Sequence, residues 1–159
     1  MTNHPLTPVD LAVAIARAGF AADLILMAVE TPTVPAAAAA LGVQPAQIIK
    51  TLLFLVHEAP FLVIASGDTL VDRRGLADRF GVGKKQIKLA DSETVLRLLG
   101  YPVGGVPPVC HLTPVPVLLD RTVGVWEVVY GGGGDDRTLL RITPGELARA
   151  TTAEWIDLG

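Results

Sequence analysis

Hydrophobic positions along the chain fall into short blocks, and most blocks end at a glycine or a proline. Leu11, Ile15 and Ala18 recur at helical spacing, Thr7 and Pro8 suit the start of a helix, and Gly19 suits its end. A helix is therefore predicted from residue 8 to residue 18. Similar signals predict further helices over residues 33–41, 71–80 and 92–99, and a capping box of Thr143 and Glu146 predicts a short last helix.

Other blocks are rich in β-branched and aliphatic residues and read as strands. Residues 48–56 form a long apolar run, residues 57–59 make a tight connection, and residues 61–65 return as a second strand. We therefore expect these two runs to form a hairpin. The remaining predicted strands cover residues 24–29, 86–89, 117–119, 125–130, 138–142 and 154–156.

The order of these elements predicts an α+β fold. Hairpin-like strand pairs alternate with isolated helices, so we expect a mixed, curved, barrel-like β-sheet of about seven strands. Four or five short helices would pack around it. There is no internal repeat and no linker, which predicts a single domain over residues 1–159.

Composition narrows the class of protein. Of the 159 residues, 50% are hydrophobic and 18% are charged, which is typical of a globular chain with its own core. The net charge of −3 argues against a general DNA or RNA binder, although a local basic group could still contact one nucleotide end. The single cysteine, Cys110, allows no internal disulfide and fits the cytoplasm. No signal peptide is expected from Met1–Pro5, and the alanine run at residues 36–40 is too short to cross a membrane.

Lys50 is the first candidate for chemistry. It interrupts the apolar run at residues 48–56, and a strand of this kind is typically buried on both faces. An ammonium group is costly there unless it is paired or faces a cavity. The simpler interpretation is a lysine near the start of a strand whose side chain reaches solvent.

Two segments rich in glycine are the other candidates. Residues 100–108 combine glycines, which let the backbone approach a ligand, with prolines, which keep the loop stiff. Residues 131–134 are four consecutive glycines after a strand, and such a run can present amide donors to an anion or a carbonyl. The alternatives are an ordinary long connection for the first segment and a flexible hairpin tip for the second.

The other reactive side chains give weaker signals. His4, His57 and His111 are scattered without metal-ligand spacing, so no metal site and no cofactor are predicted. Cys110 is expected to be a buried, inert thiol. The basic residues at 73–74 and 84–85 are interpreted as solvated charges, with contact to tRNA phosphates as the alternative.

Three segments together resemble one known family. The residues 41–43 and 47–53, with Lys50 among them, resemble the lysine-bearing strand of the YbaK and prolyl-tRNA synthetase-associated editing domains. Residues 100–108 are similar to the family's substrate loop, in which a glycine is followed after three residues by a proline, here Gly104 and Pro108. Gly131–Gly133 with Leu139, Ile142 and Leu147 resemble its closing strand and helix. The likeness extends from about residue 10 to residue 156.

The resemblance implies removal of a wrongly attached amino acid from tRNA, usually cysteine or alanine from the proline tRNA. It also implies a freestanding member that acts in trans on the 3′ end of aminoacyl-tRNA. A transient complex with prolyl-tRNA synthetase would fit this role, and no DNA or membrane partner is expected. Lys50 would be the catalytic residue. The implied substrate-binding residues are Thr51, Tyr101, Gly104, Gly105, Val106, Pro107, Pro108, Gly131 and Gly132.

The chemistry requires little from side chains because an aminoacyl ester is already activated. Lys50 could hold the tRNA end or stabilise developing negative charge, while the amides of Gly104, Gly105, Gly131 and Gly132 orient the carbonyl. Water, the vicinal ribose hydroxyl or a substrate thiol would attack. Residues 106–108 would form a stiff wall that rejects proline.

Two other classes of function remain open from the sequence. One is a binding module that holds an aminoacyl or nucleotide end, or a synthetase, without turnover. The other is an enzyme that acts on a small adenosine-containing metabolite. An editing enzyme, unlike a binding module, should remove the ester from a mischarged tRNA in a reaction that depends on Lys50. Activity on free esters but not on charged tRNA would favour the metabolite enzyme.

Overall fold

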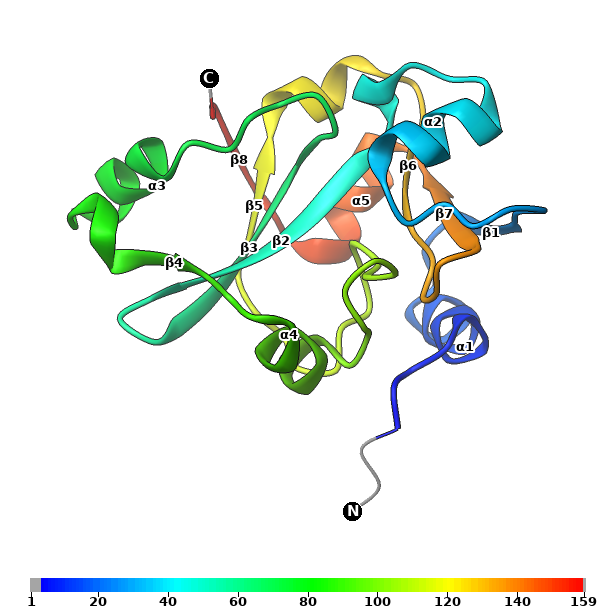
Figure 1. Cartoon of the computed structure of the whole chain (residues 1–159), viewed down its shortest axis with the longest axis horizontal. Coiled ribbons are helices and arrows are strands. Elements are labelled where there is room, and N and C mark those ends of the chain that lie inside the picture. The colour runs from blue at the N-terminus through cyan, green and yellow to red at the C-terminus, as the bar shows by residue number, and fades with distance from the viewer. Residues whose placement is uncertain (1–3, 159) are drawn as a thin grey trace.

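The computed structural model describes residues 4–158, and Figure 1 shows their arrangement. Residues 1 and 159, the limits of the predicted domain, lie outside the described part. So do Met1–Asn3, which belong to the segment where no signal peptide is expected. Five α-helices occur among the described residues: α1 (Pro8–Ala18), α2 (Val34–Leu41), α3 (Arg73–Phe80), α4 (Ser92–Leu99) and α5 (Pro144–Thr151). None of these helices is long and apolar enough to cross a membrane.

Eight strands, within the same residues, form two sheets. The larger sheet has the order β4-β2-β3-β5-β8 and the smaller sheet has the order β1-β7-β6. The strands are β1 (Ala22–Leu26), β2 (Ile49–Val56), β3 (Ala59–Ser66), β4 (Ile87–Leu89), β5 (Val117–Asp120), β6 (Val129–Gly132), β7 (Thr138–Ile142) and β8 (Glu154–Ile156). Three 3₁₀ turns complete the elements: η1 (Pro45–Gln47), η2 (Lys84–Gln86) and η3 (Arg121–Val125).

The predicted hairpin of the larger sheet is confirmed. β2 and β3 pair antiparallel from Val56 and Ala59 at the turn to Ile49 and Ser66 at the open end. The two turn residues, His57 and Glu58, both have positive φ angles of 48° and 67°, as a two-residue hairpin turn of primed type requires. β5 joins β3 in parallel and β4 joins β2 antiparallel, so the sheet is mixed, as the sequence predicts.

Both faces of the larger sheet are covered, which explains the continuous apolar runs. Leu62 and Ile64 of β3 belong to the main core, which also takes side chains from α1, α4, α5 and the smaller sheet. Phe61, Val63 and Ala65 point to the other face and pack with Leu76 and Ala77 of α3, among others. A third cluster joins α2 to Ile48 and Leu139. Alternation of side chains along β3 therefore divides one apolar run between two cores.

The predicted α+β class is confirmed, but the predicted single, barrel-like sheet is replaced by two sheets. The strands form two sheets, and neither closes into a barrel. An isolated parallel bridge between Ile48 and Tyr130 is where β2 of the larger sheet approaches β6 of the smaller one. In Figure 1, β2 crosses the front of the molecule, with α2 beside its first residues and α4 below its middle.

Several element boundaries differ from the prediction. The strand predicted at residues 24–29 is β1, which ends at Leu26 opposite Thr138, where β7 begins. One further hydrogen bond, from the amide of Met27 to the carbonyl of Arg137 at 2.7 Å, follows the last pair. The strand predicted at residues 125–130 is β6, which starts later because η3 occupies residues 121–125 after Asp120 caps it. The helix predicted from residue 71 starts at Arg73 because Asp72 is its N-cap.

Most of the predicted helix caps are confirmed, but only half of the predicted capping box at α5 forms. Asp91, directly before the helix predicted at residues 92–99, caps α4 by accepting a 2.8 Å hydrogen bond from the amide of Thr94. Thr143 caps α5 by accepting from the amide of Glu146. The Glu146 carboxylate does not complete the predicted box, because it accepts instead from the amide of Ala21 at 2.8 Å and from Arg149.

Candidate functional site

A cavity of about 310 Å³ lies along the first half of β2, bordered by α2, α4, the segment after α4 and the strands β6 and β7. Six of the residues that the sequence singled out line it: Lys50, Thr51, Gly104, Val106, Gly131 and Gly132. They come from three segments of the chain, of which the first two lie about 50 residues apart and the last two about 25. The volume is at the lower end of the range for small-ligand sites.

Four other predicted substrate-binding residues lie behind this wall and do not line the cavity: Tyr101, Gly105, Pro107 and Pro108. Tyr101 is only 1% exposed and belongs to the main core, where burial raises the pKa of its phenol to about 12. Pro107 and Pro108 are buried as well. These residues are therefore placed to support the loop, and Val106 is the one member of the predicted 106–108 wall that reaches the cavity.

Lys50 lies at the cavity with its ammonium group held by the backbone. The side chain is half-buried, and Nζ donates a hydrogen bond to the main-chain carbonyl of Thr69, in the turn that follows β3. Among residues 4–158, no carboxylate forms an ion pair with this nitrogen. The ammonium group thus has a neutral partner only and keeps its positive charge available to an anion in the cavity.

The backbone of β2 is open to the cavity beside Lys50. The carbonyl of Leu53 accepts a 2.9 Å hydrogen bond from the amide of Ala90, on the edge of β2 that faces β4. Backbone groups of alternate residues point to the same edge of a strand, so the amide and carbonyl of Thr51 point to this edge too. β4 pairs only with residues 54–56, and within the described chain no strand pairs with Thr51 on that side. Thr51 therefore offers one donor and one acceptor at the cavity wall.

The glycines of β6 permit a close approach between two segments. A Cβ atom on Gly132 would lie 2.3 Å from the carbonyl oxygen of Val106, and one on Gly131 would lie 3.1 Å from Ile49 Cγ1. Both glycines belong to β6, opposite Leu140 and Leu139 of β7. The alternative of a flexible hairpin tip is therefore wrong for these two residues, whose small size lets the substrate-loop segment pack against the strand.

The segment at residues 101–108 is fixed by hydrogen bonds at several points. The amide of Gly105 donates to the carbonyl of Pro102 at 3.1 Å, and the carbonyl of Gly105 accepts from Gly134 at 2.8 Å. His111 Nε2 lies 2.7 Å from the carbonyl of Pro107, and because a carbonyl can only accept, the imidazole donates. Burial lowers the pKa of His111, against the opposing effect of this bond, so the ring is neutral at pH 7.

Sequence reasoning missed two parts of the site. The carbonyl of Thr69 holds Lys50, and a main-chain acceptor leaves no signal in the sequence. Apolar side chains complete the cavity, among them Val34 and Ala37 of α2 and Val95 and Leu99 of α4. These residues look like ordinary core positions of amphipathic helices, and only the fold brings them to the same cavity. Cys110, predicted to be a buried, inert thiol, is only half-buried, and burial raises the pKa of its thiol.

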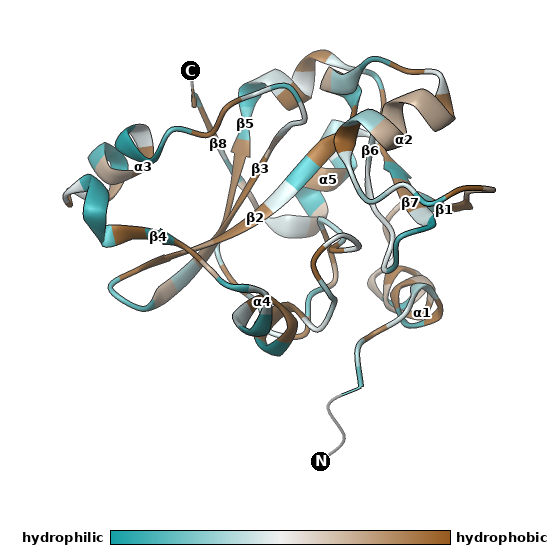
Figure 2. Cartoon of the chain, in the orientation of Figure 1, coloured by the Kyte–Doolittle hydropathy of each residue, from teal (hydrophilic) through white to brown (hydrophobic). Residues whose placement is uncertain are grey.

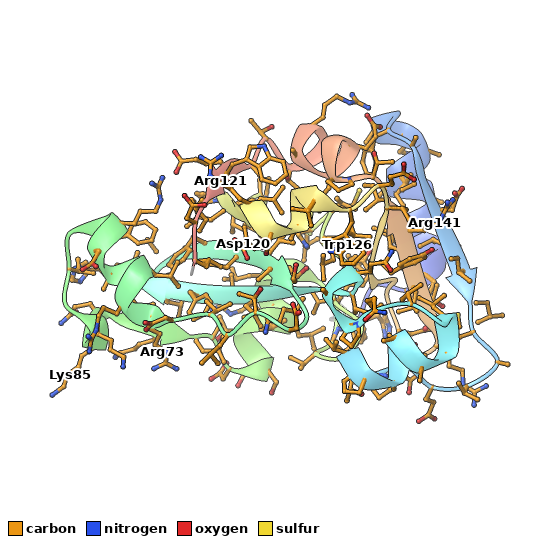
Figure 3. All side chains as sticks on the ribbon, turned by 90° about the horizontal axis from the view of Figure 1, so that it is seen from above. Arg73, Lys85, Asp120, Arg121, Trp126 and Arg141 are labelled. Carbon is orange, nitrogen blue, oxygen red and sulfur yellow. The ribbon has the colours of Figure 1, made fainter. Side chains whose placement is uncertain are left out.

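A basic surface lies next to the cavity on α3, η2 and β4. It consists of six exposed side chains, which we call the α3–β4 basic surface: Arg73, Arg74, Arg79, Lys84, Lys85 and Lys88. Only two carboxylates lie between residues 72 and 88, although the whole chain has a net charge of −3. In Figure 2, stretches of the hydrophilic colour alternate with apolar ones on this lobe, and Figure 3 shows Arg73 and Lys85 projecting outward from the same end of the molecule.

The basic surface adjoins the cavity through β4. Leu89 and Ala90, which follow Lys88 directly, line the cavity, and Leu89 is half exposed. Arg79 forms an ion pair with Glu154 of β8, while none of the other five side chains is in an ion pair with a described carboxylate. Within residues 4–158, no three His, Cys, Asp or Glu side chains gather into a group that could hold a metal ion.

Comparison with known proteins places this geometry in a family. Residues 28–150 match the family model of the aminoacyl-tRNA editing domain. Proline–tRNA ligase of Streptococcus sanguinis is 30% identical over 134 residues, which cover 82% of this chain and 21% of that protein. Proline–tRNA ligase of Desulfovibrio desulfuricans is 34% identical over 122 residues, which cover 76% of this chain and 20% of that protein. The chain thus spans about a fifth of the length of these relatives.

Solved structures share the whole fold. One, described as a candidate trans-editing enzyme for prolyl-tRNA synthetase, superposes with a TM-score of 0.88 at 33% sequence identity and covers 95% of both chains. Another, of a hypothetical protein, has a TM-score of 0.85 at 36% identity and covers 93% of this chain and 97% of its own. The resemblance seen in the sequence is thereby confirmed: the chain belongs to the aminoacyl-tRNA editing domain family.

Proposed function

We propose that this protein is a trans-acting deacylase that removes alanine or cysteine from mischarged proline tRNA. The observation that carries the proposal is the position of Lys50, whose ammonium group stands at a cavity that Gly104, Gly131 and Gly132 also line. Membership of the editing family supports aminoacyl-tRNA editing as the activity. The relatives named proline–tRNA ligase support proline tRNA as the tRNA to which the wrong amino acid is attached.

The reaction breaks the ester bond between the amino acid and the terminal ribose. A nucleophile adds to the ester carbonyl carbon, negative charge develops on the carbonyl oxygen, and the ribose oxygen leaves with a proton. Lys50 is placed either to stabilise this developing charge or to hold the terminal phosphate. The open backbone of Thr51 supplies a further donor and acceptor at the same wall. Catalysis of this kind relies on positioning rather than on a nucleophilic side chain.

The nucleophile comes from water or from the substrate. Lys50 is the only ionisable side chain among the described residues that line the cavity, so the wall supplies no pair of nucleophile and base. Attack by water releases the free amino acid, and attack by the thiol of a cysteinyl substrate releases a cyclic thioester. In both cases the tRNA recovers its terminal hydroxyl.

The size and stiffness of the cavity fit a small amino acid. Val106 reaches the cavity, and Pro107 and Pro108 behind it are buried, with the carbonyl of Pro107 held by His111. A wall of this kind resists displacement by a larger side chain, which is the basis for rejecting proline while alanine is accepted. Because a single methylene changes binding by only about 1–3 kcal/mol, the wall has to be rigid for this rejection to matter.

The α3–β4 basic surface is the proposed contact for the tRNA backbone. Its exposed cations lie on the lobe that carries Leu89 and Ala90 to the cavity, so an acceptor stem could cross it while the 3′ end enters the site. A transient complex with prolyl-tRNA synthetase would deliver the substrate, and the cytoplasm is the proposed setting for both proteins. This local positive charge supports a tRNA substrate for a chain whose net charge is −3.

One observation favours a second function, a binding module without turnover. The cavity wall has a cation and backbone groups but no base among the described residues, and these features suffice to hold an aminoacyl or nucleotide end. The test is a panel of tRNAs charged with alanine, cysteine, serine and proline and followed for loss of the ester. Accelerated loss from the alanyl or cysteinyl tRNA supports the deacylase, whereas binding with ester loss at the uncatalysed rate supports the module.

A further inference from the structure

A buried carboxylate outside the cavity has no part in the mechanism described so far. Asp120, at the end of β5, is 2% exposed, and it is the only Asp, Glu, Lys or Arg among the described residues that is so deeply buried. No described cation forms an ion pair with it. Figure 3 shows Asp120 in the interior, with its neighbour Arg121 near the outer surface. A deeply buried carboxyl group is costly unless its oxygens are hydrogen-bonded, so the hydrogen bonds of Asp120 identify what it does.

The carboxylate of Asp120 is the end of a short hydrogen-bonded chain. Thr122 Oγ1 donates to Asp120 Oδ2 at 2.5 Å, and Ser66 Oγ lies 3.3 Å from Thr122 Oγ1. Thr122 has a single hydroxyl proton, which it gives to the carboxylate, so Ser66 must be the donor in the second bond. The direction of the chain is therefore fixed, from Ser66 through Thr122 to Asp120.

Ser66 begins the turn that holds Lys50. The carbonyl of Ser66 accepts a 3.0 Å hydrogen bond from the amide of Thr69 and closes the turn over residues 66–69. The carbonyl of Thr69 then accepts from Lys50 Nζ. One continuous path thus leads from the Asp120 carboxylate to the ammonium group at the cavity, although neither Asp120 nor Thr122 lines it.

The other side of this turn is packed without free space. A Cβ atom on Gly67 would lie 2.5 Å from Val34 Cγ1 and 2.9 Å from the carbonyl oxygen of Ile48, and the Gly67 amide donates to that same carbonyl at 2.6 Å. The turn is therefore held from α2 and β2 on one side and from Ser66 on the other. Ser66 also pairs with Ile49 in the β2–β3 ladder, so loss of its hydroxyl bond to Thr122 would leave this side of the turn held by strand pairing alone.

We propose that Asp120 and Thr122 are positioning residues for the editing reaction, which fix the 66–69 turn through Ser66 and so aim Lys50 into the cavity. The proposal rests on the proposed function, because it assigns a reason for holding Lys50 in place. A purely structural role would affect turnover whether or not Lys50 is present. The proposed role affects turnover only through the position of Lys50.

Thr122 is the residue to change, because it is exposed and its replacement leaves the core packing intact. Thr122→Val removes the hydroxyl at nearly constant shape, and Thr122→Ser restores it. Thr151→Val is the matched control, because Thr151 also donates a 2.7 Å hydroxyl hydrogen bond, to Leu147 within α5, and lies outside the cavity wall. Single-turnover loss of the ester from alanyl-tRNA is measured for each variant, alone and combined with Lys50→Ala.

We expect Thr122→Val to slow the single-turnover rate roughly 3- to 10-fold, as loss of one hydrogen bond in the path predicts. Thr122→Ser should restore the rate and Thr151→Val should leave it unchanged. Thr122→Val should have no further effect once Lys50 is alanine. An unchanged rate in Thr122→Val, or an equal loss with and without Lys50, would overturn the proposal.

A second measurement needs no enzymatic activity, so it separates failure of this proposal from failure of the proposed function. The amine of Lys50 is labelled with a small amine-reactive ester, and the rate is compared by mass spectrometry with that of exposed Lys88 in the same protein. Release of the turn should increase the relative labelling of Lys50 in Thr122→Val and leave it unchanged in Thr151→Val. Equal labelling in wild type and Thr122→Val would overturn the positioning role, even if the protein proves to be inactive on every charged tRNA.

Discussion

Gly132 of β6 lies directly against the main-chain carbonyl of Val106, so close that a Cβ atom would stand 2.3 Å from the oxygen. No side chain fits in this gap, and the carbonyl of Val106 cannot easily move away because the neighbouring Gly105 and Pro107 are buried and hydrogen-bonded. The close approach joins two walls of the cavity that lie about 25 residues apart in the sequence. It also gives the glycine run a packing role that the sequence alone did not reveal.

Gly132→Ala should therefore displace the segment at residues 101–108 and distort the cavity. We expect a stability loss of about 1–3 kcal/mol, as overpacking typically costs, together with a fall in deacylation that exceeds what partial unfolding explains. Denaturant unfolding and single-turnover kinetics measure the two effects. Gly75→Ala is the control, because a Cβ atom at this helical position meets nothing within 4 Å. Wild-type kinetics in Gly132→Ala would contradict the packing role.

Gly104 is required for a different reason. It has a φ angle of +99° and open space around the position of a Cβ atom, so Gly104→Ala strains the backbone without causing a clash. We expect the strain, about 1–2 kcal/mol, to reshape the cavity rim and raise KM for the charged tRNA. Gly19→Ala carries a similar strain at φ +77° in the cap of α1, away from the cavity. An equal effect on KM in both variants would argue that strain alone, and not the place of Gly104, is responsible.

Much of the fold could be predicted because local signals and tertiary packing agree. The turn at residues 57–58 connects two apolar runs, and Asp91 and Thr143 are strong N-caps at the start of amphipathic helices. Boundaries failed where a distant partner decides them. β1 ends where β7 begins, and Glu146 leaves its own cap to bind Ala21, which is 125 residues away.

The candidate site was predictable in its charged and glycine-rich parts and not in the rest. Lys50 is conspicuous because it interrupts an apolar strand, and Gly104 and Gly132 stand in two segments that are conspicuously rich in glycine. The Thr69 carbonyl, the open backbone edge at Thr51 and the division between lining and supporting residues depend on register and packing. A sequence carries no direct record of either.

The α3–β4 basic surface predicts a salt-dependent interaction with tRNA. Replacing Lys84, Lys85 and Lys88 by alanine should raise KM for charged tRNA without changing the single-turnover rate at saturation, because the cavity remains intact. The logarithm of the association constant for tRNA should fall less steeply with the logarithm of the salt concentration. The slope should become less negative by about 0.7–0.9 for each phosphate that the triple variant no longer neutralises. Arg17→Ala, at an exposed position of α1, is the control and should leave both quantities unchanged. Identical salt slopes for wild type and the triple variant would contradict tRNA binding at this surface.

Glu146 predicts an acid-dependent contribution to stability that is independent of the cavity. Hydrogen bonds from Arg149 and from the amide of Ala21 lower the pKa of its carboxyl group from 4.5 to about 2. A depressed pKa in the folded state stabilises the protein above the unfolded value, and this stabilisation is lost as the pH falls from about 4.5 towards 2.

Glu146→Gln should therefore lower the melting temperature at pH 7, and the difference from wild type should shrink through that acid range. Melting curves of both proteins between pH 7 and pH 2 provide the measurement. Glu127→Gln serves as a reference, because Glu127 is exposed and has no ion pair among the described residues. A difference that stays constant with pH would contradict the role of the ionised carboxylate.

The most direct measurement is ester loss from alanyl-tRNA of the proline type, compared between the wild-type protein and Lys50→Ala under single-turnover conditions. Within residues 4–158, the Lys50 side chain makes one hydrogen bond, at the margin of the cavity, so its removal should leave the melting temperature close to that of wild type. We expect the rate to fall by about 100-fold or more, the size of effect that follows from removing one electrostatic interaction with a transition state. A folded Lys50→Ala protein that deacylates the substrate at the wild-type rate would contradict the central role of this ammonium group.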